Sequence, residues 1–168
     1  MDSEALRALQ SPLKDRYRQA PDTARITLGA EGRIGEGVTC KVDTGRALVE
    51  AGLHPATGGT GSSVCSGDML LEALVACAGV TLNAVATALG VKLNDARVRA
   101  EGDLDFRGTL GVSKDVPVGF QHIRLRFELD TEATEDEVAT LLRLTERYCV
   151  VYQTLAHPPT LEVTRTGA

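Results

Sequence analysis

Apolar and polar residues alternate with a period of two along two stretches in the second half of the chain. One stretch runs from Ala96 to Phe106 and the other from His122 to Leu129. Alternation of this kind predicts strands that bury one face and expose the other. The connection between them, Gly108 to Gly119, contains both Gly and Pro. We therefore expect two strands of an antiparallel sheet.

A long apolar stretch precedes these two strands. No charged residue occurs between Glu72 and Lys92, and alanine dominates the composition there. The stretch lacks the basic flanks and the aromatic belt of a membrane span, so it predicts a helix buried on most sides within a soluble protein. Ser66 is expected to cap this helix, Asp68 complements its positive end, and Gly90 ends it.

A second helix, amphipathic, is predicted after the strands. Thr134 and Glu137 have the spacing of a capping box, and apolar residues recur behind them at helical intervals as far as Cys149. Cys149 is therefore expected at or just beyond the end of this helix, on its inward side. The segment from Thr160 to Thr164 is predicted as a last strand.

The N-terminal half is predicted to hold a short helical segment and an antiparallel meander. Leucines recur at helical spacing within residues 3–20, which favours one or two short peripheral helices. Three short β-type runs follow: Arg25–Leu28, Gly37–Val42 and Arg46–Glu50. The chain is thus divided into an N-terminal helical extension, residues 1–24, and a single domain, residues 25–168.

The composition describes one soluble globular domain of 168 residues. The net charge of −5 argues against nucleic acid as a partner, since binding to phosphates needs clustered positive charge. The first four residues lack the basic and apolar segments of a secretory signal, so we expect a cytoplasmic protein with no membrane association. The three histidines lack zinc-site spacing, and the Gly58 to Gly61 loop predicts a turn rather than a phosphate cradle.

Four cysteines, Cys40, Cys65, Cys77 and Cys149, are expected to be mostly reduced in a cytoplasmic protein. Cys77 lies in the middle of the long apolar helix. One interpretation is a core residue that packs as a small hydrophobe. The other is a reactive thiolate, which needs a cation or hydrogen-bond donors from another segment because apolar burial disfavours the charged form.

Two motifs resemble the OsmC/Ohr family of thiol peroxidases. The first is Gly58-Gly59 followed by Ser66–Cys77, and the second is Tyr148–Leu155. The resemblance spans Arg25 to Val163. It implies an α+β, OsmC-like fold with an antiparallel sheet, a long buried central helix and a second helix. It also implies that two chains intertwine as a homodimer, with the active sites at their interface.

The chemistry that the resemblance implies is the detoxification of organic hydroperoxides by paired cysteines. Cys77 would be the peroxidatic residue and Cys149 the resolving residue, with an external thiol or dithiol as reductant. No metal or organic cofactor is required. The oxidative-stress role of such a peroxidase would be carried out in the cytoplasm.

The chain departs from the family pattern ahead of the helix. Gly67 stands where members with peroxidase chemistry usually carry the glutamate that orients an arginine, and the neighbouring Asp68 is a shorter and differently directed carboxylate. The arginine itself is expected in the N-terminal meander, with Arg33, in a turn-like context, favoured over Arg25 and Arg46. Loss of the glutamate is expected to weaken activation of the thiolate.

Two alternatives stay open. The chain could be an OsmC-like protein that binds a small molecule or senses thiol redox state without efficient turnover, or both cysteines could be packing residues. Cys65, at the start of the long helix, is a candidate alternative resolving thiol, although about 18 Å of helix would separate it from Cys77. Cys40 is expected to be structural.

Overall fold

The computed structural model describes residues 2–5, 8, 11, 19, 31–34, 39–43, 48–111 and 113–167, with backbone only for the first two strands. The elements are β1 (Glu31–Ile34), β2 (Thr39–Asp43), β3 (Leu48–Gly52), the 3-10 turn η2 (Pro55–Thr57), β4 (Val64–Cys65), α2 (Ser66–Leu89), β5 (Leu93–Asp103), α3 (Phe106–Thr109), β6 (His122–Thr131), α4 (Glu135–Tyr148) and α5 (Val150–Ala156).

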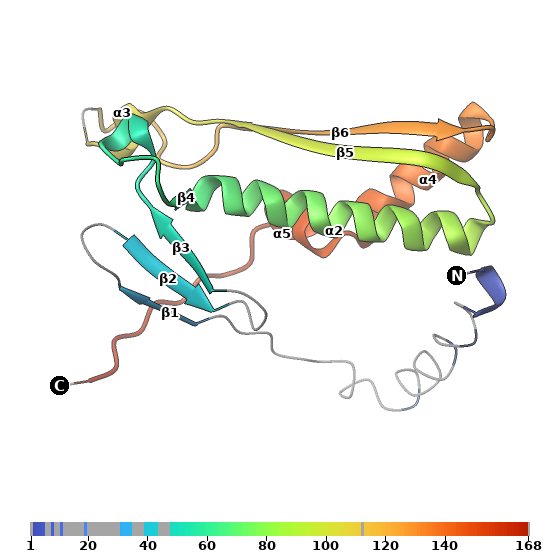
Figure 1. The fold of residues 1–168 in the computed structure, drawn as a ribbon, viewed down its shortest axis with the longest axis horizontal. Coiled ribbons are helices and arrows are strands. Elements are labelled where there is room, and N and C mark those ends of the chain that lie inside the picture. The colour runs from blue at the N-terminus through green and yellow to red at the C-terminus, as the bar shows by residue number, and fades with distance from the viewer. Residues whose placement is uncertain are drawn as a thin grey trace.

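The long helix α2 organises the molecule (Figure 1). The antiparallel pair β5 and β6 runs along one side of α2, while α4 and α5 pack against it from another side. The second sheet has the order β1-β2-β3-β4 and lies at the end where α2 begins. Its pairs are antiparallel except β3 with β4, which are parallel. The expected α+β architecture with antiparallel strands and a long central helix is confirmed.

The two ends of α2 are capped in different ways. Cys65 occupies the N-cap position, so the prediction that Ser66 caps the helix is wrong by one residue, and the Cys65 side chain makes no capping hydrogen bond. Asp68 lies in the first turn, as expected. Gly90 ends the helix in the left-handed conformation, at φ 73°, with its N–H directed to the carbonyls of the last turn. The predicted stop is confirmed.

Only one stripe of α2 is buried within the single chain. Leu74, Ala78, Leu82, Val85 and Ala86 form this stripe against β5, α4 and α5. The expectation of burial on most sides is wrong for the single chain, because these elements cover one face and leave Val80 73% exposed on another. By length and composition alone α2 is also sufficient to cross a membrane.

Strands β5 and β6 pair in the register that the alternation requires. Val98 lies opposite Phe127 and Ala100 opposite Leu125, and these residues pack against the buried stripe of α2. The expected first strand ends at Asp103, because Phe106 instead begins the short helix α3. The central parts of both predicted strands are confirmed.

The segment from Thr160 to Thr164 does not form the predicted strand. Leu161 is 86% exposed and Val163 is 96% exposed. A strand needs a neighbour for its backbone hydrogen bonds, and no described strand pairs with this segment. The alternation of apolar residues is present as predicted, but it finds no partner strand in the part of the chain that the structure describes.

The N-terminal predictions have mixed outcomes. β2 and β3 lie within about two residues of the predicted runs, whereas Glu31–Ile34 forms β1 rather than the turn expected around Arg33. The reason is a partner strand, since Arg33 pairs with Lys41 of β2. The predicted run Arg25–Leu28 and nearly all of the 1–24 extension lie outside the described residues, although Ser3 to Ala5 are helical.

The capping box of α4 generates a stability prediction. Thr134 accepts a hydrogen bond from the Glu137 N–H, and the Glu137 carboxylate accepts one from the Thr134 N–H. Substitution Thr134→Ala removes the side-chain acceptor, so we expect unfolding in urea to show a loss of about 1 kcal/mol. An unchanged midpoint would show that α4 does not depend on this cap.

Candidate active site

A single residue, Cys149, joins α4 to α5. It is the C-cap of one helix and the N-cap of the next, with φ −74° and ψ 107°. Its N–H donates to the Thr145 carbonyl of α4, and its carbonyl accepts from the Gln153 N–H of α5, both at 2.9 Å. The residue is 1% exposed. The sharp corner therefore places the Cys149 sulfur in the interior, as its helical spacing predicted.

A side chain on α5 fixes this corner. Gln153 Nε2 donates to the Glu146 carbonyl in the last turn of α4 at 2.9 Å. The final carbonyls of a helix have no intrahelical partner, so this bond satisfies one of them and links the two helices across the junction. The position of the first turn of α5 is thereby tied to that of α4.

Cys77, which is carried by α2, lies beside the α4–α5 corner. It packs against the buried cluster formed by Leu74, Ala78 and Cys149, and it retains partial exposure while Cys149 is fully buried. All three described cysteines are free thiols. The structure thus brings together the two predicted site residues, which lie far apart in the sequence.

The surroundings favour the thiolate form of Cys77. Burial is the largest influence and raises the pKa of its thiol, but hydrogen bonds from the Val151 N–H, the Cys149 thiol, the Val150 N–H and the Thr81 hydroxyl outweigh it, so the pKa is lowered below its ordinary value. The donors that a reactive Cys77 requires come mainly from the start of α5. Three polypeptide segments contribute to one sulfur.

The pKa of Cys149 is shifted in the opposite direction. Burial is again the largest influence and raises the pKa of its thiol; the Tyr152 N–H lowers it, but the hydrogen bond to Cys77 and the charge on Cys77 raise it further, so the net shift is upward. The two sulfurs titrate as a coupled pair. The hydrogen bond between the two sulfurs thus lowers the pKa of Cys77 and raises that of Cys149, which favours Cys77 as the thiolate and Cys149 as the donor.

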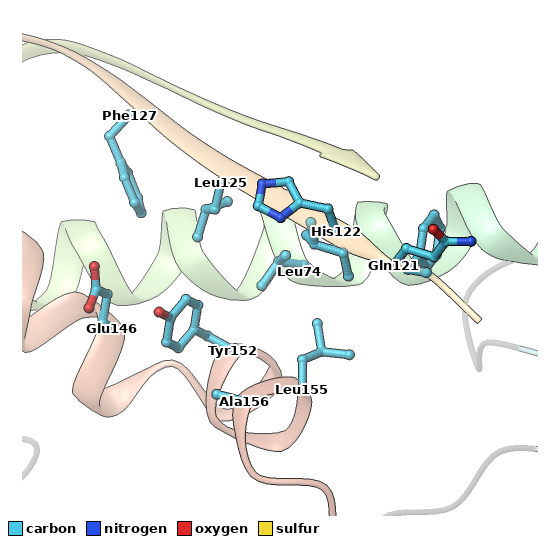
Figure 2. A pocket seen from close by; sticks show the side chains of 11 residues that line it. Leu74, Gln121, His122, Leu125, Phe127, Glu146, Tyr152, Leu155 and Ala156 are labelled. Atoms are coloured by element: carbon cyan, nitrogen blue, oxygen red, sulfur yellow. The ribbon is translucent and has the colours of Figure 1, made fainter. Parts of the chain in front are cut away.

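A pocket of about 400 Å³, lined by both apolar and polar side chains, lies beside the cluster that holds this pair (Figure 2). Figure 2 shows Leu74 from α2, Leu125 and Phe127 from β6, and Tyr152 and Leu155 from α5 around the same space. Leu74, Tyr152 and Leu155 also belong to the cluster around Cys149. Glu146 and His122 supply polar groups to its wall. The pocket therefore shares wall residues with the cysteine cluster, although neither cysteine lines it.

The residues at the start of α2 lie apart from the cysteine pair. Cys65, Gly67 and Asp68 line a second cavity of about 360 Å³ together with His54 and Phe120. Asp68 precedes Cys77 by about 14 Å of helix, and Cys65 by about 18 Å, so neither contacts Cys77. Within the single chain, Cys65 is therefore not a resolving thiol within reach of Cys77.

The three candidate arginines contribute no described side chain to the site. Arg33 is placed only by its backbone in β1, whereas Arg25 and Arg46 lie outside the described residues. Cys40 lies in β2, opposite Ala51. Among the residues that the structure describes, no group of three or more His, Cys, Asp or Glu side chains is arranged to hold a metal ion.

Sequence reasoning missed two parts of this site. The backbone N–H groups of Val150 and Val151 carry no signature in their side chains, so only the three-dimensional corner reveals them. Thr81 was detectable, because residues four apart on a helix lie on the same face and Thr81 follows Cys77 by four.

Comparisons with known proteins give one consistent result. The family described as "OsmC-like protein" matches residues 59–164. Among solved structures, an OsmC-like protein from Mycoplasma pneumoniae superposes with a TM-score of 0.67 at 17% identity, covering 79% of this chain and 89% of that one. A search of curated protein sequences gives no match.

Two further structures carry names that refer to hydroperoxides. An organic hydroperoxide resistance protein OsmC from Legionella pneumophila has a TM-score of 0.62 at 18% identity, covering 80% of this chain and 92% of that one. The organic hydroperoxide resistance protein OhrB of Bacillus subtilis has a TM-score of 0.52 at 19% identity, covering 79% and 93%. At these identities the likeness shows a shared fold.

The opposite pKa shifts of the two cysteines generate a prediction about reactivity. Because the pKa of Cys77 is lowered and that of Cys149 is raised, iodoacetamide should modify Cys77 first, and the pH midpoint of Cys77 alkylation should lie below that of a free cysteine. Peptide mass spectrometry across a pH series measures both sites at once. Faster modification of Cys149 would contradict the assignment.

Proposed function

The chain belongs to the family of OsmC-like proteins, and from that premise we propose that it is a cysteine-based peroxidase that reduces organic hydroperoxides. The observation that carries the proposal is the contact between a hydrogen-bonded Cys77 sulfur and the thiol of Cys149. A nucleophilic thiolate beside a second thiol is the arrangement that such a peroxidase needs. The hydroperoxide-resistance names of two structural neighbours agree with this proposal.

The first chemical step is oxidation of Cys77. Its thiolate attacks the distal oxygen of the hydroperoxide, an S–O bond forms, and the O–O bond breaks. The sulfur becomes a sulfenic acid, and the departing alkoxide takes a proton to leave as an alcohol. The donors around Cys77 supply nucleophilic thiolate before this step.

The second step forms a disulfide. The Cys149 thiol attacks the Cys77 sulfenic acid, an S–S bond forms, and the sulfenic oxygen leaves as water. Because the two side chains already lie in one cluster, this condensation needs only local adjustment of the α4–α5 corner. Rapid capture also protects Cys77 from further oxidation by a second peroxide.

An external thiol or dithiol completes the cycle. Two thiol groups reduce the disulfide to two cysteines and become a disulfide themselves. Cys149 is 1% exposed and Cys77 is partly exposed, so an entering thiol meets the Cys77 sulfur first. A cytoplasmic location, which we include in the proposal, supplies such reductants.

The substrate class follows from the surroundings of the two sulfurs. Their neighbours are Leu74, Ala78 and side chains of β5, β6 and α5 that are almost entirely apolar. The adjoining pocket continues this apolar surface. An organic hydroperoxide with an apolar body suits such walls better than hydrogen peroxide, which has no apolar surface to bury.

A second candidate function rests on Gly67. This residue offers no carboxylate to orient an arginine, and its nearest neighbours are Phe120, Cys65 and Leu104. The alternative is therefore an OsmC-like protein that is oxidised at Cys77 as a redox sensor, without efficient turnover. Steady-state assays with cumene hydroperoxide and a dithiol separate the two, because a peroxidase shows many turnovers and a sensor only one.

The proposal includes a homodimer. α2 leaves an apolar face open, with Val80 at its centre, and the segment after α5 exposes Leu161 and Val163 without a strand partner. A second copy of the chain would cover the open face of α2 and pair with the segment after α5. This assembly would also complete the burial of α2 that its composition predicts.

The cysteine roles are tested by two substitutions. Cys77→Ser is expected to abolish reduction of cumene hydroperoxide, whereas Cys149→Ser should still release one equivalent of alcohol and then accumulate oxidised Cys77. Dithiol consumption and product alcohol are measured together. Retained turnover in Cys77→Ser would remove Cys77 from the mechanism, and full turnover in Cys149→Ser would remove the resolving role.

The assembly is tested by a charge on the open face of α2. Sedimentation should show a dimer for the unmodified chain and a monomer for Val80→Glu, because burying an unpaired carboxylate is costly. The matched control is Val118→Glu, which changes an exposed loop valine of similar exposure. A monomeric unmodified chain, or equal behaviour of both variants, would contradict the proposed interface.

A further inference from the structure

The hydroxyl of Thr81 has one hydrogen and lies near two acceptors that belong to the same residue. It donates to the Cys77 carbonyl, with 2.8 Å between the two oxygens. Because Thr81 follows Cys77 by four residues on α2, and helical side chains lean toward the N-terminus, the hydroxyl lies over the turn that carries the Cys77 side chain. The same hydroxyl is one of the donors that lower the pKa of the Cys77 thiol, so the Cys77 sulfur is the second acceptor within its reach.

The helix loses little stability if the Thr81 hydroxyl no longer donates to the Cys77 carbonyl. The Cys77 carbonyl is also the regular i→i+4 acceptor of the Thr81 backbone N–H within α2, so it keeps a partner when the hydroxyl turns away. Bonds from threonine to the carbonyl four residues earlier add nothing that the helix needs. The Thr81 hydroxyl can thus turn toward whichever of the two groups, the Cys77 carbonyl or the Cys77 sulfur, is the stronger acceptor.

We propose that Thr81 is a further active-site donor, which bonds the Cys77 carbonyl while the sulfur is a thiol and transfers its hydrogen bond to the sulfur when the thiolate forms. This inference rests on the proposed function in that it assigns Thr81 a role at the same nucleophile. A hydrogen bond to a charged group is stronger than one to a neutral carbonyl. Ionisation of Cys77 therefore drives the change of partner.

The other groups around Cys77 do not replace this donor. Two are backbone N–H groups of α5, and Cys149 gives up its hydrogen when it becomes the attacking thiol. The strand residues packed on the same cluster, such as Val98 and Ala100 of β5, are apolar, and Cys149 is the titratable group that acts on Cys77 from the α4–α5 corner. Of the two side chains that donate to the Cys77 sulfur, Cys149 and Thr81, Thr81 is the one that does not take part in the redox steps.

The experiment compares three substitutions at Thr81 in the full-length chain. Thr81→Val and Thr81→Ala remove the hydroxyl, and Thr81→Ser retains it. We expect the first two to raise the pKa of Cys77, which moves the midpoint of Cys77 alkylation to higher pH, and to slow alkylation at neutral pH about tenfold, as expected for the loss of one hydrogen bond to a charged acceptor. Thr81→Ser should behave like the unmodified chain.

Thr87 supplies the matched control. It lies on the same helix, and its hydroxyl donates to the Asn83 carbonyl at 2.8 Å, the same bond without a sulfur nearby. Thr87→Val should leave Cys77 alkylation unchanged. Thermal unfolding of each variant shows that the comparison is made between folded proteins, and if Val at position 81 prevents folding, Thr81→Ala carries the test.

The outcomes separate this inference from the proposed function. Alkylation needs no peroxide, so a shifted midpoint in Thr81→Val and Thr81→Ala supports the inference even if the chain shows no turnover. An unshifted midpoint in a chain that turns over hydroperoxide overturns the inference and leaves the function intact. Equal shifts in Thr81→Val and Thr87→Val also overturn it, because the effect would then belong to the helix.

Discussion

The site depends on hydrogen bonds donated to one sulfur that is carried by an apolar helix. Placing Cys77 among Leu74, Ala78 and their neighbours raises the pKa of its thiol, because a charge is poorly stabilised in apolar surroundings. The N–H groups at the start of α5, with the Cys149 thiol, reverse that effect. Apolar burial and the donors of the α4–α5 corner thus act in opposite directions on the pKa of one thiol.

The rest of the chain positions those donors. α2 is fixed against β5 by apolar contacts and against α4 by a core that includes Leu82 and Leu141. The corner at Cys149 is fixed by hydrogen bonds on both sides and by the Gln153 amide across the junction. A displacement of α5 would move Cys149 and both N–H donors together, so in the proposed mechanism the activation of Cys77 and its resolution depend on the same corner.

Local signals allowed some of this arrangement to be predicted from the sequence. The capping box at Thr134, the alternation along β6 and the left-handed stop at Gly90 each depend on neighbouring residues, and all three were predicted correctly. The predictions that failed depended on distant partners. Arg33 lies in a strand because β2 pairs with it, and Thr160 to Thr164 forms no strand because no strand among the described residues pairs with it. The meeting of Cys77 with Cys149 was expected from resemblance, whereas the backbone donors beside them were not.

The most direct test of the account is to treat the reduced protein with one equivalent of cumene hydroperoxide and to map its disulfides by peptide mass spectrometry. The account predicts one new bond, between Cys77 and Cys149, formed with loss of two hydrogens from the protein and release of one equivalent of cumyl alcohol. Oxidation that leaves these two cysteines unlinked, or that links Cys77 to Cys65 instead, would contradict it.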